Sequence, residues 1–132
     1  MKPLKEISFH FKGWTSTNKL RNCMNRWQMN SIKDKERKRF RKLLKDLMND
    51  CQFNSRIDVH IIKRSRLDTD NTSGKFLFDS MQDLDMIKSD APKHIREITI
   101  THNDTLPSDC YVVRFYLAGN DEELNHLDFP SY

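Results

Sequence analysis

Apolar and polar residues alternate in four short segments of the chain, which is the pattern of strands that bury one face. The segments are residues 6–11, 56–66, 97–102 and 111–117. The side chains on their apolar sides are Ile7, Phe9, Phe11, Ile57, Val59, Ile61, Ile98, Ile100, Val113, Phe115 and Leu117. We therefore expect four strands, with residues 103–109 as a hairpin loop between the last two.

Two other segments repeat apolar residues at steps of three and four, which indicates amphipathic helices. The longer stripe runs through Phe40 and Leu44, and Ser31 with Asp34 predicts a capping box at its start. The shorter helix is expected over residues 73–84, and both helices should bury their apolar stripes against the strands.

Residues 12–30 are polar and basic and lack such a repeat. They are expected to form a long loop, anchored to the body by Trp14, Trp27 and Met29. The order strand, helix, strand, helix, strand, strand predicts an α+β fold, in which a small mixed β-sheet of about four strands carries two main helices. At 132 residues the chain has the length of a single domain, 1–132.

The composition limits the classes of protein to consider. Hydrophobic residues make up 36% of the chain and charged residues 32%, which is typical of a globular protein. No apolar run approaches the roughly 18 residues of a membrane span. Cys23, Cys51 and Cys110 are far apart and lack zinc-binding spacing. This cysteine usage favours a reduced, cytoplasmic compartment.

Charge is divided unevenly between the two halves of the chain. Residues 1–66 contain 18 Lys and Arg against 6 Asp and Glu, whereas residues 67–132 contain 5 against 13. This asymmetry indicates a basic surface for an anionic partner, beside an acidic region able to hold a metal ion. The alternative is that the two halves interleave in the folded domain, so that the asymmetry disappears in space.

Three carboxylates stand out in the acidic half. Asp68 and Asp70 follow the second expected strand, and Asp90 lies beyond the next helix. Carboxylates brought together without a cation repel each other, whereas Mg²⁺ or Mn²⁺ prefers such oxygen ligands. A bound ion would supply water and neutralise charge at a phosphodiester, and Lys75 is placed to assist at the phosphate or the leaving group. If Asp90 meets the other two, the sequence predicts a metal-dependent nuclease site.

Two other interpretations of this segment remain open. The stretch from Asp68 to Gly74 is similar to a calcium loop, but an EF-hand needs glycine and glutamate where this chain has Ser73 and Asp79. Segments rich in Asp and Asn also form ordinary turns for backbone reasons. The five histidines have no metal-ligand spacing, and the chain has no glycine-rich phosphate loop.

These motifs, in this order, resemble the RusA-like Holliday junction resolvases, which are crossover junction endodeoxyribonucleases of bacteria and phages. The resemblance covers about residues 5–118 and rests on three stretches. They are the opening strand followed by Trp14-Thr15-Ser16-Thr17-Asn18, the motif Asp68-Thr69-Asp70-Asn71 with Lys75 and Asp79 behind it, and Ser89-Asp90-Ala91-Pro92 before the next strand.

The resemblance implies an endonuclease that resolves Holliday junctions by paired symmetrical nicks during DNA recombination and repair. It implies a homodimer on four-way DNA, in the cytoplasm of a bacterial or phage-infected cell, with Mg²⁺ or Mn²⁺ and no small-molecule cofactor or membrane. The catalytic residues would be Asp68, Asp70, Lys75 and Asp90, and the metal ligands Asp68, Asp70 and Asp90. The residues expected to bind DNA are Asn18, Lys19, Arg21, Lys63, Arg64, Arg66 and Asn71. The alternative is a catalytically inactive DNA-binding accessory protein of the same fold.

Overall fold

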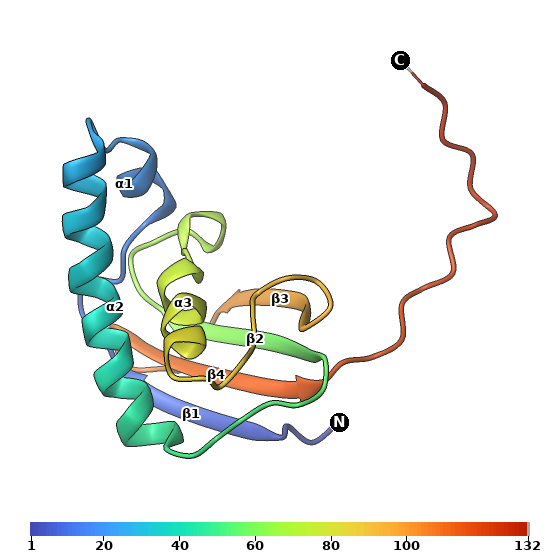
Figure 1. Cartoon of the computed structure of the whole chain (residues 1–132), viewed down its shortest axis with the longest axis horizontal. Coiled ribbons are helices and arrows are strands. Elements are labelled where there is room, and N and C mark those ends of the chain that lie inside the picture. The colour runs from blue at the N-terminus through green and yellow to red at the C-terminus, as the bar shows by residue number, and fades with distance from the viewer. Residues whose placement is uncertain (132) are drawn as a thin grey trace.

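A four-stranded mixed sheet with helices on one face forms the body of the protein (Figure 1). The computed structural model describes residues 1–131. The strands are β1 (Lys5–His10), β2 (Ile57–Arg64), β3 (Ile95–His102) and β4 (Cys110–Leu117). The helices are α1 (Thr17–Arg21), α2 (Arg26–Met48) and α3 (Lys75–Asp83), with a short 3₁₀ turn, η1 (Thr69–Asn71). The expected α+β class is therefore confirmed.

The strands lie in the order β1-β4-β2-β3. β4 is antiparallel to both of its neighbours, β1 and β2, whereas β3 runs parallel to β2 at the edge of the sheet. The prediction of a hairpin over residues 103–109 was wrong, because β3 and β4 do not pair. Instead, α3 connects the parallel strands β2 and β3, since a parallel pair needs a crossover connection.

The core lies between the sheet and the helices α2 and α3. The strand side chains that are at most 4% exposed on this face include Ile7, Val59, Ile61, Val113 and Phe115, and the helix side chains include Phe40, Leu44, Leu77 and Met81. Two positions expected to face inward are open to solvent, since Ile98 is 46% and Leu117 52% exposed. Ile98 belongs to the edge strand, and Leu117 is the last residue of β4.

The region expected to be one long loop contains α1 and the first turn of α2. Ser16 caps α1 by accepting a hydrogen bond from the Lys19 amide at 2.9 Å. Asn25 caps α2 in the same way, accepting from the Gln28 amide at 2.8 Å. The expected capping box at Ser31 was therefore wrong, because α2 begins at Arg26. Side-chain caps start both helices in a sequence that has no apolar repeat to reveal them.

Residues 118–131 lead away from the body as an extended acidic tail (Figure 1). The start of the tail is held to the sheet, because the Gly119 amide donates to Asp58 at 3.1 Å. Asp121 then lies 3.4 Å from Arg56 and 3.8 Å from Arg96. Further along, Leu124, Leu127 and Phe129 are 46%, 48% and 75% exposed.

Candidate functional site

Asp70 lies on η1 and Asp68 is the residue just before it, a few residues beyond the carboxyl end of β2. The backbone of this turn is fixed by short-range hydrogen bonds. The Asn71 amide and the Thr72 hydroxyl both donate to the Asp68 carbonyl at 3.0 Å. The Asp68 and Asp70 side chains are exposed, so both can reach a partner outside the protein.

Helix α1 packs against this turn, although about fifty residues separate them along the chain. The Asn18 amide donates to Asn71 Oδ1 at 2.8 Å, and Ser16 forms an isolated β-bridge with Thr72. Trp14 Nε1 donates to the Ser73 carbonyl at 2.6 Å and is buried, as its predicted anchoring role requires. The structure thus brings the two parts of the predicted site together, the basic segment and the first two carboxylates.

Three residues of the predicted DNA-binding set lie on α1. Lys19 and Arg21 occupy its last turn, and Asn18 precedes them; all three are exposed. Lys75, the first residue of α3, is also exposed and belongs to the same end of the molecule, because only three residues separate it from η1. Asp79 follows one turn later on α3 and is half-buried.

Asp90 does not join Asp68 and Asp70. The Ile95 amide donates to the Ala91 carbonyl at 3.0 Å, which holds the neighbour of Asp90 at the beginning of β3. Asp68, in contrast, lines a cavity with His102, the last residue of β3. The length of an eight-residue strand, about 23 Å, separates the two positions. Figure 1 shows the segments that follow β2 and precede β3 at opposite ends of the parallel pair.

The expected meeting of three carboxylates within one chain was therefore wrong. The reason is topological, because the start of β3 lies beside the start of β2 when the two strands are parallel. Within residues 1–131, no group of three or more His, Cys, Asp or Glu side chains is arranged to hold a metal ion. A metal site on η1 would consist of Asp68 and Asp70 alone.

These two carboxylates still suit a magnesium ion. Mg²⁺ is commonly bound through one or two carboxylates together with waters and substrate phosphates. In the described part of the chain, neither Asp68 nor Asp70 is committed to an ion pair. The donor set thus fits an ion that is completed by the substrate, and not one enclosed by the protein.

Lys63 was expected to contact DNA, but the structure buries it. Its side chain is 1% exposed, and its Nζ donates to the Leu67 carbonyl and lies 3.5 Å from His102 Nδ1. Burial lowers the pKa of the Lys63 ammonium, while the nearby charge of Asp68 acts in the opposite direction. The lysine therefore braces the turn that presents Asp68, and the prediction that it meets phosphates at the surface was wrong.

Arg64 and Arg66, the two arginines that follow Lys63, make different contacts. Arg64 Nη1 donates to the carbonyls of Asp104 and Leu106, at 3.0 and 2.8 Å, and so holds the loop between β3 and β4. Arg66 is exposed and lines two cavities, of about 570 and 580 Å³. Of the three basic residues Lys63, Arg64 and Arg66, Arg66 is exposed without such a contact within residues 1–131 and is placed to meet a phosphate.

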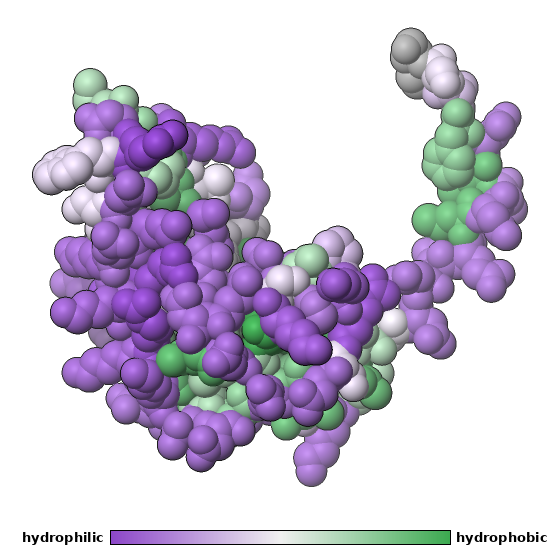
Figure 2. Space-filling model, in the orientation of Figure 1, coloured by the Kyte–Doolittle hydropathy of each residue, from purple (hydrophilic) through white to green (hydrophobic). Residues whose placement is uncertain are grey.

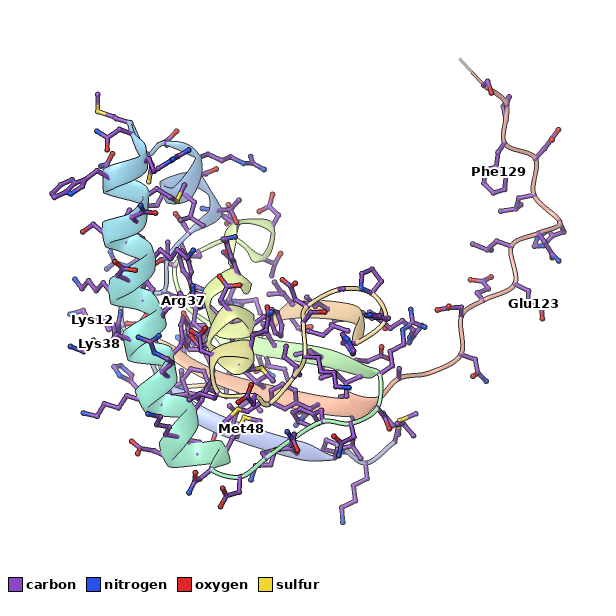
Figure 3. All side chains as sticks on the ribbon, viewed as in Figure 1. Lys12, Arg37, Lys38, Met48, Glu123 and Phe129 are labelled. Carbon is purple, nitrogen blue, oxygen red and sulfur yellow. The ribbon has the colours of Figure 1, made fainter. Side chains whose placement is uncertain are left out.

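The sequence did not indicate how far the basic surface extends. Helix α2 contains nine Lys and Arg and three Asp and Glu, and most of its visible face is hydrophilic in Figure 2. Figure 3 shows Lys38 of α2 and Lys12 of the preceding loop on the same side of the molecule. Arg39 Nη2 links these segments by donating to the Lys12 carbonyl at 2.6 Å. Because α2 begins at Arg26, earlier than expected, the basic surface extends further along the molecule than the sequence indicated.

Trp27 differs most from its predicted role. It was expected to anchor the loop, yet its side chain is 81% exposed on the first turn of α2. An earlier start for α2, signalled by Asn25 as its cap, would have placed Trp27 on the outer side of the helix.

Comparison with models of known protein families gives no match, and comparison with curated proteins gives none either. Among the helices of residues 1–131, none has both the length and the apolar character needed to cross a membrane.

Proposed function

We propose that the protein binds branched DNA and cuts it with the help of a divalent metal ion, as RusA-like resolvases do. One observation carries this proposal. The exposed pair Asp68 and Asp70 lies against α1, whose Lys19 and Arg21 are exposed, and the Asn18–Asn71 hydrogen bond joins the two segments. A phosphodiester substrate needs cations that bind its phosphates, and a metal ion needs carboxylate ligands. This arrangement supplies both kinds of group side by side.

Each group in this proposal has a defined part. Asp68 and Asp70 would hold Mg²⁺ or Mn²⁺, which when bound neutralises charge at the phosphate and provides an acidic water. Lys19, Arg21 and Arg66 would bind the flanking phosphates by charge, without reading bases. Lys75 would stabilise the negative charge that develops at the scissile phosphate.

Because Asp90 lies far from Asp68 and Asp70 of its own chain, the proposal has two forms, which differ in the role of Asp90. In the first form, Asp90 has no part in the reaction. In the second form, the protein is a two-fold dimer, and Asp90 of the partner subunit completes the site formed by Asp68 and Asp70. Two-fold symmetry repeats each contact between subunits, so both sites would be completed together. A symmetrical pair of sites also suits paired nicks in a four-way junction.

The basic test uses a labelled synthetic four-way junction with and without Mg²⁺. We expect nicks only with the metal ion, and we expect Asp70→Asn to retain junction binding while it loses cleavage. Asp128→Asn, the same change at an exposed position of the tail, is the matched control and should cut normally. Cleavage by Asp70→Asn at the wild-type rate would refute the assignment.

Mixing two variants separates the forms of the proposal. If Asp90 acts across the dimer, Asp70→Asn and Asp90→Asn are each inactive, but their heterodimer has one intact site and makes single nicks. If Asp90 has no part in the reaction, Asp90→Asn alone cuts at the wild-type rate. If both variants are inactive and the mixture stays inactive, Asp90 does not act across the dimer.

A second candidate is a DNA-binding accessory protein of the same fold that does not cut. The distance between Asp90 and the pair Asp68 and Asp70 favours it, because one chain alone supplies two carboxylates at η1. Tight binding of the junction, with no nicks in either Mg²⁺ or Mn²⁺, would identify this function.

A further inference from the structure

Trp27 is a large aromatic side chain held in water on a rigid element. It is 81% exposed, and Met24 beside the same corner is 89% exposed. Two hydrogen bonds fix this corner, from the Gln28 amide to Asn25 Oδ1 at 2.8 Å and from the Met24 amide to Gln28 Oε1 at 2.7 Å. The indole is therefore presented by an ordered helix start.

The same outer face of α2 carries exposed lysines. An α-helix turns about 100° per residue, so Lys38 and Lys45 lie within about 20° of the direction of Trp27. The rise of the helix places them about 16 and 27 Å from Trp27 along its axis. Both lysines are exposed, and Arg26 adds a further exposed cation next to Trp27. Exposed Asp34 lies in the same direction between Trp27 and Lys38, so the face combines an aromatic ring at one end with two lysines further along the helix.

We propose that Trp27 is a nucleobase-stacking site: the lysines of α2 follow the phosphates of one strand, and the indole stacks on an unpaired base. This inference rests on the proposed binding of branched DNA. A positive groove or face with an aromatic platform is the general arrangement by which proteins hold single strands. Single strands offer unpaired bases, and an open branch point interrupts the stacking of bases where the arms meet, whereas the bases of a closed duplex are stacked on each other.

The charge of this face also argues against other occupants. A second copy of the chain would bring its own lysines against the same face, and like charges repel. A partner helix would need an apolar stripe beside Trp27, but Lys38 and Lys45 occupy that direction. A polyanion that carries aromatic bases matches both features.

The protein contains its own optical probe for this site. It has two tryptophans, and Trp14 is 6% exposed with its Nε1 hydrogen-bonded, so changes in emission on binding report mainly Trp27. We expect oligothymidine and a four-way junction to quench this emission and to protect Trp27 from acrylamide. A closed duplex of equal length should do neither.

Substitutions of Trp27 test whether its side chain contributes to the binding of single strands. Trp27→Ala should weaken binding of oligothymidine and of the junction about tenfold, with little change for duplex, and Trp27→Phe should retain most of the affinity. Lys38→Ala tests the phosphate contacts separately: it should reduce the salt dependence of binding and leave the quenching at saturation unchanged. Circular dichroism should confirm that each variant is folded.

Failure of this inference differs from failure of the proposed function. If a mobility-shift assay detects no binding of any nucleic acid, the proposed function is wrong, and so is this inference. If the wild type binds but Trp27 emission is unchanged and Trp27→Ala binds equally well, only the stacking site is refuted. A change in Trp27 emission with protein concentration alone, without nucleic acid, would assign the face to self-association and would overturn the inference.

Discussion

Lys63 and Arg66 are basic residues three positions apart, yet the structure gives them opposite properties. Lys63 is 1% exposed, whereas Arg66 is open to solvent. Loss of one phosphate contact lowers the salt slope of DNA binding by about one. We therefore expect Arg66→Met to reduce the slope by about one and Lys63→Met to leave it unchanged, as measured by anisotropy of a labelled junction over a range of salt concentrations. Equal effects of the two changes would contradict the burial of Lys63.

At the residue scale, the sequence predicted part of the candidate site. Asp68, Asp70 and Asn71 were identified by type and spacing, and the structure places the turn that contains Asp70 and Asn71 against α1. Asp90 was grouped with them because the chain has to return after α3. Residue spacing does not say to which end of the sheet the chain returns, and the parallel pairing of β2 with β3 takes Asp90 to the far end.

At the scale of elements, Trp14 joins three parts of the fold. Its ring stacks on Tyr111 of β4 at 4.4 Å between centroids and meets Phe40 of α2 at 5.0 Å. Its Nε1 donates a hydrogen bond to the carbonyl of Ser73, which lies just before α3. Trp14→Phe removes this hydrogen bond and leaves unfilled volume, so the free energy of unfolding should fall by about 2 kcal/mol.

Urea denaturation measures this loss, with Trp27→Phe as the matched control. The control makes the same chemical change at an exposed position, so it should alter the free energy of unfolding by less than about 0.5 kcal/mol. The slope of the free energy against urea should be similar in both variants. A Trp14→Phe variant as stable as the control would show that Trp14 does not bind these elements together.

Apolar periodicity predicted the strands and the two main helices because burial of one face creates that pattern. It did not predict α1 or the first turn of α2, where the caps Ser16 and Asn25 start helices with polar sequences. Apolar periodicity also did not predict which strands pair with each other. The segments 97–102 and 111–117 have the same alternation whether they pair with each other or with β2, and the structure shows both of them paired with β2.

At the scale of the whole molecule, the charge asymmetry of the sequence persists in space between the basic helices and the acidic tail. The basic helices α1 and α2 are part of the body, whereas the acidic tail extends away from it (Figures 1 and 2). Segments of the two halves do interleave within the sheet, since β4 lies between β1 and β2. Outside the sheet the halves meet again, because Arg37 and Arg41 of α2 form ion pairs with Asp83 of α3. The tail is therefore the acidic segment that stands apart from the basic helices (Figure 1).

The tail should therefore weaken the attraction of the body for a polyanion. Ending the chain after Asp121 removes Glu122, Glu123 and Asp128 but keeps the ion pairs of Asp121, and the formal net charge changes from +4 to +7. We expect the shortened protein to bind junction DNA roughly tenfold more tightly at low salt. The gain should vanish at high salt, because salt screens exposed charges that are more than a Debye length apart.

A full-length variant with Glu122→Gln, Glu123→Gln and Asp128→Asn separates charge from bulk. If charge is the cause, this variant matches the shortened protein in affinity and in salt dependence. A second control, Leu124→Ser with Leu127→Ser and Phe129→Ser, keeps the charge and removes the exposed apolar side chains, so it should bind as the wild type does. If the shortened protein gains affinity equally at low and high salt while the neutralised variant does not, the tail acts by covering the surface and the electrostatic explanation is wrong.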